Sequence, residues 1–234
     1  MSADGAAENR LYISGPIEPQ RPWWDWEKEE PMAAATEFQA ELDKLDGQPL
    51  TIVIDSDGGD LGAGLTMYNA IRARKGETKA VIWHAYSAAT MPLCACRGGR
   101  AISPVGTLLI HNPATLATGD HREMEKAKTF LAAMKDAAIA AYQEVTGMGY
   151  DELAKMMDDE TVLTAEAAVR MGFADSILEA GGVQAEDTVA RAKSAMAASM
   201  AATRAGVEQL LKAQEADRKD AEERERIAAW AEAL

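Results

Sequence analysis

Short apolar runs bounded by glycine, proline and polar residues alternate along this chain with longer stretches of helical period. Continuous β-branched and aliphatic runs without a polar face are typical of strands that are buried on both sides. The segments predicted as strands on this basis are Leu11–Ile13, Leu50–Ile54, Val81–Trp83, Ala101–Ser103, Thr107–Ile110 and Phe173–Leu178.

The stretches between these strands carry apolar residues three or four positions apart, the period of an amphipathic helix. The longest predicted helix covers about residues 120–146, and its predicted apolar side consists of Met124, Phe130, Leu131, Met134, Ile139 and Tyr142. Shorter helices are predicted at Thr36–Leu45, through Leu65–Ile71, after Ser87, at Tyr150–Met157 and from Thr164 to Gly172. Because strands and helices alternate, the pattern predicts an α/β fold with a mostly parallel sheet covered by helices.

The composition changes at Gly181-Gly182, after which alanine and charged residues predominate. Beyond that point apolar residues such as Met196, Met200 and Val207 recur at four- and seven-residue intervals. We therefore predict a flexible N-terminus at 1–10, an α/β domain at 11–180, and a helical or partly disordered tail at 181–234 that binds a partner. A proline- and tryptophan-rich segment, Pro19–Trp26, is predicted to be a surface flap.

Charge and composition narrow the possible functions. The 234 residues carry a formal net charge of -14, which argues against a broad nucleic-acid-binding face. We expect no membrane span, since no apolar run reaches the ~18 residues required, and no signal peptide in the polar segment Met1–Arg10. Cys94 and Cys96 are interpreted as buried free thiols in a cytoplasmic protein. The sequence shows no phosphate-binding loop, and we expect neither a cofactor nor a metal.

Three predicted strands lead into residues that are able to take part in catalysis. They end at Gly58-Gly59, at Ser87 and at His111. Sites in open α/β sheets lie beyond the carboxyl ends of the strands, and acyl transfer by serine needs a base and an oxyanion hole. The alternatives are a serine that caps a core helix and a purely structural histidine. His84 is interpreted as a packed strand-end residue and His121 as a solvated one.

The motifs around these residues resemble those of the Clp (caseinolytic) protease family. Ile54–Gly59 (I-D-S-D-G-G) is similar to the family's I-N-S-P-G-G turn. Tyr86-Ser87-Ala88 resembles its A-A-S-M serine motif, and Leu109–Pro113 resembles its M-I-H-Q-P histidine motif. Glu160–Ala167, followed by Gly172–Asp175, is similar to the family's acid-containing segment and last strand.

Within that family, the chain most resembles the Clp-like head-maturation (prohead) proteases of tailed phages and prophages. Members of that branch often carry a tryptophan-rich segment like Trp23-Trp24, and D-E-T-W-L-T-A-E-E-A where this chain has Asp159–Ala168. The resemblance covers about residues 10–180. It implies that 11–180 forms a crotonase-like (Clp-type) βαβ fold that acts as a serine peptidase.

The resemblance also implies roles for individual residues. Ser87 would be the nucleophile and His111 the general base, while Glu160 would orient the imidazole. The backbone N–H groups of Gly59 and Ala88 would form the oxyanion hole. The family's acid is an aspartate, so this chain departs from the pattern at position 160.

Several alternatives and departures remain open at the level of the sequence. Asp159 and Asp158 are alternative acids, because a one-residue slip on a strand changes the face that a side chain presents. Thr90 is an alternative nucleophile. Asp57 replaces the family's proline, and Tyr86 replaces a small residue, from which position it would crowd Ser87 or cover the substrate pocket.

The function implied by the resemblance is that of an ATP-independent serine endopeptidase that cleaves capsid or scaffold proteins during phage head assembly. It implies stacked homo-oligomeric rings, with the long helix after His111 at the contact between rings, in the host-cell cytoplasm or the assembling virion. The alternatives are a catalytically impaired assembly or scaffold-interaction protein and a crotonase-type acyl-CoA enzyme in which Ser87 has no role.

Overall fold

The computed structural model describes residues 9–20 and 33–178. The tryptophan pair at 23–24 and the tail predicted at 181–234 lie outside the described residues. The strands are β1 (Asn9–Ser14), β2 (Ile17–Glu18), β3 (Ala33–Ala34), β4 (Leu50–Ser56), β5 (Thr78–Tyr86), β6 (Arg100–Ile110), β7 (Thr161–Thr164) and β8 (Ser176–Ile177). The helices are α1 (Ala35–Lys44), α2 (Leu61–Ala73), the 3-10 helix η2 (Ser87–Ala89), α3 (Thr90–Ala95), α4 (His121–Thr146), α5 (Tyr150–Asp158) and α6 (Ala165–Arg170).

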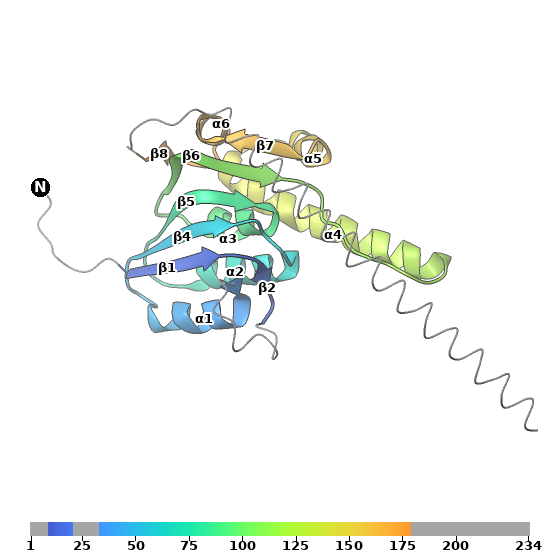
Figure 1. Cartoon of the computed structure of the whole chain (residues 1–234), viewed down its shortest axis with the longest axis horizontal. Coiled ribbons are helices and arrows are strands. Elements are labelled where there is room, and N and C mark those ends of the chain that lie inside the picture. The colour runs from blue at the N-terminus through green and yellow to red at the C-terminus, as the bar shows by residue number, and fades with distance from the viewer. Residues whose placement is uncertain (1–8, 21–32, 179–234) are drawn as a thin grey trace, which may run out of the picture. The chain divides into compact units, whose positions relative to one another are not determined.

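The predicted mostly parallel sheet is confirmed. The strand order is β1-β4-β5-β6-β7, and β8 also pairs with β6 (Figure 1). β1, β4, β5 and β6 run parallel to one another, whereas β7 is antiparallel to β6. The carboxyl ends of the parallel strands therefore lie at one edge of the sheet, where β4, β5 and β6 deliver the three catalytic candidates.

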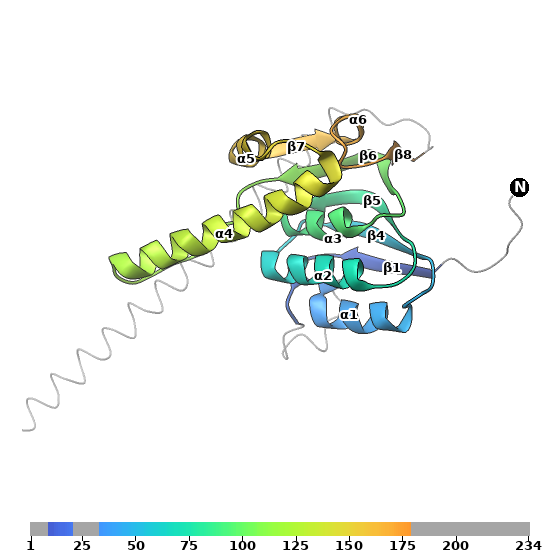
Figure 2. The same ribbon diagram turned by 180° about the vertical axis from the view of Figure 1, so that it is seen from behind.

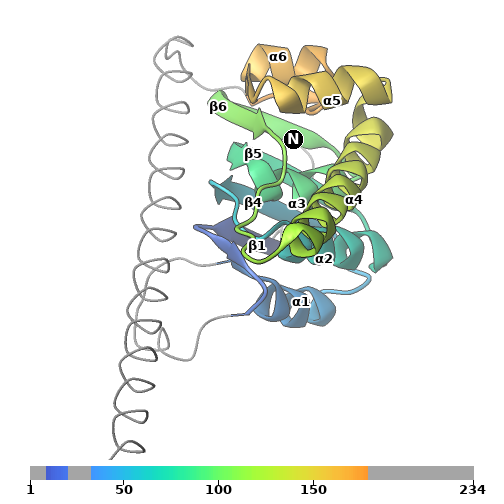
Figure 3. The same ribbon diagram turned by 90° about the vertical axis from the view of Figure 1, so that its right-hand side faces the viewer.

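Helices α1, α2, α3 and α4 lie on the same face of the sheet, as the views from behind and from the side show (Figures 2 and 3). Between the sheet and these helices lies an apolar core, because the strands are aliphatic and each helix turns one apolar stripe inward. The side chains that are almost completely buried in this core include Ile13, Ile52, Ile54, Met67, Ile82, Met91, Leu93 and Phe173.

The two strands predicted at Ala101–Ser103 and Thr107–Ile110 are a single strand, β6. Between the pairs Ile82–Ile102 and His84–Thr107, β5 advances by two residues and β6 by five, so the extra residues form a bulge. A bulge tolerates Pro104, which has no N–H to donate to the ladder. This is why the strand continues where the sequence indicates a break.

The last predicted strand, Phe173–Leu178, is reduced to the two residues of β8. The N–H groups of Phe173 and Ala174 donate to the carbonyl oxygen of Ala168, at 2.9 and 3.1 Å, at the end of α6. Backbone groups bonded to a helix end are not available to a strand ladder. Bonding to β6 therefore begins only at Asp175, whose N–H donates to the Arg100 carbonyl oxygen at 2.7 Å, and the paired residues of β8 start at Ser176.

The long helix α4 contacts the core only through its C-terminal half. Its buried residues are Ala138, Ile139, Ala141 and Tyr142, whereas Phe130 is 56% exposed. The first half extends beyond the sheet (Figure 1), so the apolar side predicted for the whole helix is wrong for this part. Among the described helices, α4 included, none is long and apolar enough to cross a membrane.

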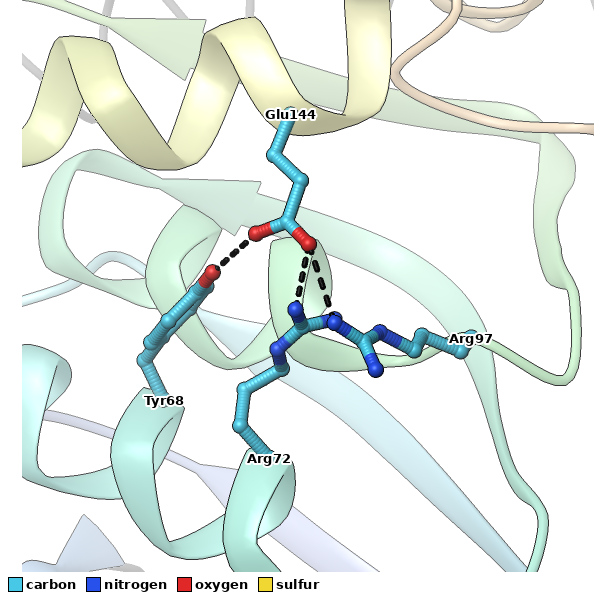
Figure 4. A network of polar contacts seen from close by, with 4 residues as sticks. All are labelled: Tyr68, Arg72, Arg97 and Glu144. Atoms are coloured by element: carbon cyan, nitrogen blue, oxygen red, sulfur yellow. Dashed lines mark hydrogen bonds and ion pairs between the residues drawn. The ribbon is translucent and has the colours of Figure 1, made fainter.

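A polar network holds the buried half of α4 in place (Figure 4). The Tyr68 hydroxyl donates to Glu144 on α4 at 2.5 Å, and Arg72, also on α2, pairs with the same carboxylate. Arg97, which follows α3, donates to it at 3.1 Å. Glu144, which lies two residues after Tyr142 on α4, therefore links this helix to α2 and to the residue that follows α3.

Candidate active site

Ser87 lies at the junction between β5 and η2, and its backbone has an unusual conformation. Its φ angle is 53°, in the left-handed region that residues other than glycine seldom adopt. Because η2 begins at Ser87, the N–H of Ala88 lies in a first helical turn, which offers it no internal acceptor. The junction thus combines a hydroxyl with a neighbouring backbone donor.

His111 follows the end of β6, and its side chain reaches Ser87. The distance between His111 Nε2 and Ser87 Oγ is 2.7 Å. Partial burial lowers the pKa of His111 below its ordinary value, and the negative charge of Glu160 offsets part of this effect. The imidazole is therefore neutral near pH 7 and can accept the serine proton through Nε2.

The Gly58-Gly59 turn passes directly beside Ser87. A Cβ atom on Gly58 would lie 2.5 Å from the Tyr86 carbonyl oxygen and 2.9 Å from Ser87 Cβ. One on Gly59 would lie 2.3 Å from the carbonyl oxygen of Ile17. Only glycines can occupy this space, and the turn therefore brings its backbone within reach of a group bound at Ser87.

Ser56, a residue not predicted from the sequence to have a role in the site, holds this turn. Its hydroxyl donates to the Gly15 carbonyl oxygen at 2.6 Å and accepts from the N–H of Gly58 at 3.1 Å. The residue is 1% exposed. A serine immediately before a glycine pair was the available signal, since serine hydroxyls commonly bond to backbone groups two residues on.

The three candidate acids have different partners. Asp158 accepts from Lys135 Nζ at 2.7 Å and from Asn112 Nδ2 at 2.8 Å, and Asp159 pairs with Lys155. Glu160 lies in the turn before β7 with a φ of 49°. The hydrogen bonds of the described residues include none from His111 to Glu160, but the charge of Glu160 raises the pKa of His111.

Thr90 does not fit the alternative role of nucleophile. It is fully buried, and its hydroxyl donates to the Ser87 carbonyl oxygen at 2.6 Å. The same Oγ1 atom lies 2.7 Å from the Tyr142 hydroxyl on α4. A side chain enclosed by the core and bonded on both sides cannot meet a substrate. Tyr142 was predicted only as an apolar position of its helix.

The side chain of Tyr86 bonds to the neighbouring strand. Its hydroxyl lies 2.6 Å from Thr107 Oγ1 on β6, and the side chain is buried. His84 is also not simply packed, because its ring contacts Asp55 Oδ1 at 2.5 Å and Asp57 Oδ1 at 3.3 Å.

The expected buried thiols are confirmed, and His121 is exposed as expected. Cys94 and Cys96 are free, and burial raises the pKa of each to about 12. Thiols that remain protonated are poor nucleophiles. Among the described residues, this leaves the hydroxyl of Ser87, bonded to an imidazole, as the group suited to nucleophilic attack.

A serine hydroxyl bonded to a neutral imidazole at the carboxyl ends of parallel strands is the arrangement used by serine hydrolases. A model of the Clp protease family matches residues 32–181 of the chain. This match covers more than half of the sequence. The chain therefore belongs to the Clp protease family and is a serine peptidase with its α/β fold.

Individual relatives agree with this assignment. Proteolytic subunit 1 of the ATP-dependent Clp protease from Chlamydia abortus is 29% identical over 136 residues, which cover 56% of this chain and 71% of that protein. The subunit of the same name from Corynebacterium glutamicum is 29% identical over 153 residues, 62% of this chain and 74% of its own length. A mutant ClpP1 structure from Listeria monocytogenes has a TM-score of 0.61 and 24% identity, covering 74% of this chain and 92% of that one.

Proposed function

We propose that the chain cleaves peptide bonds with Ser87 as nucleophile, His111 as general base and Glu160 as the acid that acts on the imidazole. The observation that carries this proposal is the 2.7 Å contact between Ser87 Oγ and His111 Nε2. His111 takes the proton of Ser87 as the hydroxyl attacks the substrate carbonyl, and later gives it to the leaving amine. Water then hydrolyses the acyl-enzyme by the same route.

The negative charge that develops on the substrate oxygen needs donors that are in place before the reaction. We propose the backbone N–H groups of Gly59 and Ala88 for this role. Support comes from the Gly58-Gly59 turn, which lies against Ser87, and from the position of Ala88 in the first turn of η2.

The proposed role of Glu160 is to stabilise the imidazolium that forms during attack. The support is electrostatic, since Glu160 is the carboxylate whose charge raises the pKa of His111. Asp158 and Asp159 each have a lysine partner, and a carboxylate neutralised in this way is less suited to the role. Replacement of the acid generally slows such enzymes by orders of magnitude.

We further propose that the substrates are capsid or scaffold proteins and that the chain acts without ATP, as a head-maturation protease in the host-cell cytoplasm or the assembling virion. The tryptophan pair Trp23-Trp24 and the segment Asp159–Ala168 support this proposal. Assembly into stacked homo-oligomeric rings is part of it. The fold and family are common to ATP-dependent subunits as well, so the substrate class rests on these branch motifs alone.

Replacement of the nucleophile tests the catalytic assignment. We expect Ser87→Ala to abolish both peptide cleavage and covalent labelling by a fluorophosphonate, because loss of the nucleophile removes the acyl-enzyme step and costs about 10⁶-fold in kcat in a serine protease. Labelling is read by mass spectrometry of the intact protein. Ser176→Ala serves as the control variant, since it removes an exposed hydroxyl on β8, beside the start of β6 and therefore at the opposite end of that strand from His111, and should leave labelling intact. Persistent labelling of Ser87→Ala would discard the assignment.

A further inference from the structure

The hydroxyl of Thr90 takes part in two consecutive hydrogen bonds, and only one assignment of donors and acceptors is possible for them. Thr90 Oγ1 lies 2.6 Å from the Ser87 carbonyl oxygen and 2.7 Å from the Tyr142 hydroxyl. A carbonyl can only accept, so the single proton of Thr90 goes to Ser87. Tyr142 must then donate to Thr90. The Tyr142 hydroxyl thus donates to the Thr90 hydroxyl, which donates to the backbone carbonyl oxygen of Ser87.

That carbonyl belongs to the same peptide unit as the N–H of Ala88. The unit is planar, and the described residues contain no cis peptide bond. In a trans peptide the C=O and N–H groups point in opposite directions, so fixing one of them fixes the other. A hydrogen bond that draws the Ser87 carbonyl toward Thr90 therefore turns the Ala88 N–H away from the core, on the side of the Gly58-Gly59 turn.

Tyr142 is itself held firmly, as a positioning group must be. Its ring packs edge-on against Phe173, with centroids 5.5 Å apart. Two residues later, Glu144 is bound by Tyr68, Arg72 and Arg97 (Figure 4). Burial raises the pKa of Tyr142 above its ordinary value, so its hydroxyl keeps the proton that it donates to Thr90.

We propose that Thr90 and Tyr142 are positioning residues that hold the peptide between Ser87 and Ala88 so that the Ala88 N–H faces the developing oxyanion. This inference rests on the proposed function. Neither residue touches the substrate. The left-handed backbone of Ser87 is a conformation that the surroundings must maintain, and the buried hydroxyl pair supplies that restraint from α4.

The backbone N–H of Thr90 also bonds to the Ser87 carbonyl oxygen, so loss of the hydroxyl weakens the restraint without removing it. We expect Thr90→Val to lower kcat by about tenfold, less than the 10²–10³-fold loss that follows deletion of an oxyanion donor. KM should change little, because the oxyanion forms only during the reaction. Thr90→Ser retains the hydroxyl and should restore kcat.

The measurements are kcat, KM and the rate of fluorophosphonate labelling, with the melting temperature recorded for each variant. Thr90→Val leaves the Tyr142 hydroxyl buried without a partner and can lose stability for that reason. The double variant Thr90→Val/Tyr142→Phe removes both hydroxyls and should fold better while losing as much kcat as Thr90→Val alone. Tyr150→Phe is the matched control, since it removes a tyrosine hydroxyl that bonds to Asp136 on α4 without reaching Ser87 or the Glu144 network, and it should keep kcat.

A fall in kcat in the double variant, with KM unchanged and rescue by Thr90→Ser, supports the inference. Wild-type kcat and labelling rate in the double variant overturn it, even if the melting temperature falls. In that case Ser87→Ala would still be inactive, and the proposed function would stand. A wild-type protein that is not labelled at Ser87 overturns the proposed function and this inference together.

Discussion

Ser87 and Glu160 are the two non-glycine residues in the described part of the chain with a φ angle in the left-handed region, at 53° and 49°. Such conformations cost about 1–3 kcal/mol each and persist only where the surroundings impose them. Ser87 is restrained by Thr90, and the N–H of Glu160 bonds to the Met157 carbonyl oxygen at 3.2 Å. Both strained positions thus belong to the proposed catalytic residues.

The pH dependence of activity should report the pKa of His111. The imidazole accepts the Ser87 proton only when it is neutral, and burial lowers its pKa below the ordinary 6.5. We therefore expect kcat/KM to remain high below pH 6.5 and to fall only as the pH drops through the lowered pKa. Glu160→Gln removes a charge that raises this pKa, so the acid limb should move to still lower pH while the plateau of kcat also falls.

Asp159→Asn is the matched control for this titration, because Asp159 pairs with Lys155. It should leave the acid limb of kcat/KM where the wild-type protein has it. A limb that moves in Asp159→Asn but not in Glu160→Gln would transfer the role to the aspartate. The same series with Asp158→Asn completes the comparison of the three acids.

At the scale of elements, the turn between β4 and α2 is confined on two sides. Gly58 lies against the backbone of β5 and η2, and Gly59 lies against Ile17 of β2. A backbone between two others leaves no volume for a side chain. The turn therefore keeps its distance from Ser87 through contact, and the anchor at Ser56 fixes its orientation.

The Gly58→Ala variant should distinguish the effect of this close contact on activity from the effect of backbone strain on stability. The added Cβ would lie 2.5 Å from the Tyr86 carbonyl oxygen, so the turn must move away from Ser87. We expect peptidase activity to fall at least 10²-fold, the scale of losing an oxyanion donor. Gly47→Ala is the control, because Gly47 also has a positive φ, of 79°, but has open space around it.

In this comparison, both glycine variants should lower the melting temperature through backbone strain, at about 1 kcal/mol each from that source. Only Gly58→Ala should lose activity. Equal activities of the two variants would contradict the assigned place of the turn in the site. Activity is read with a peptide substrate at a temperature well below both melting transitions.

At the scale of the whole molecule, the N-terminal half of α4 presents apolar side chains that the described part of the chain does not cover. Phe130 is 56% exposed and Met124 is 39% exposed. Large exposed apolar side chains on a helix are typical of protein–protein contacts. This half of α4 is consistent with the proposed contact between rings, whereas its other half is held by Glu144.

Light scattering tests the proposed assembly. The wild-type protein should have a molar mass many times that of the 25.1 kDa chain. Phe130→Asp places a charge where an apolar contact is proposed and should lower this mass, while the circular dichroism spectrum stays unchanged. Lys128→Ala, a nearby exposed change on the same helix, should leave the mass unaltered. A strictly monomeric wild-type protein would contradict the ring assembly.

The sequence alone determined the mostly parallel sheet and the residues at its strand ends, because apolar runs and the turns that end them are local properties. Gly58-Gly59, Ser87 and His111 could be found in this way, since parallel strands deliver their ends to one edge. The sequence did not determine that β6 is continuous through Pro104, because the bulge exists only in the pairing of β6 with β5.

Only the tertiary structure decided between the candidates that the sequence left open. Thr90 is excluded as nucleophile by a bond to Tyr142, which lies 52 residues away along the chain, and Asp158 and Asp159 differ from Glu160 through their lysine partners. Burial and partner choice depend on how α3, α4 and α5 pack. Such contacts are non-local, and no pattern within a short stretch of residues specifies them.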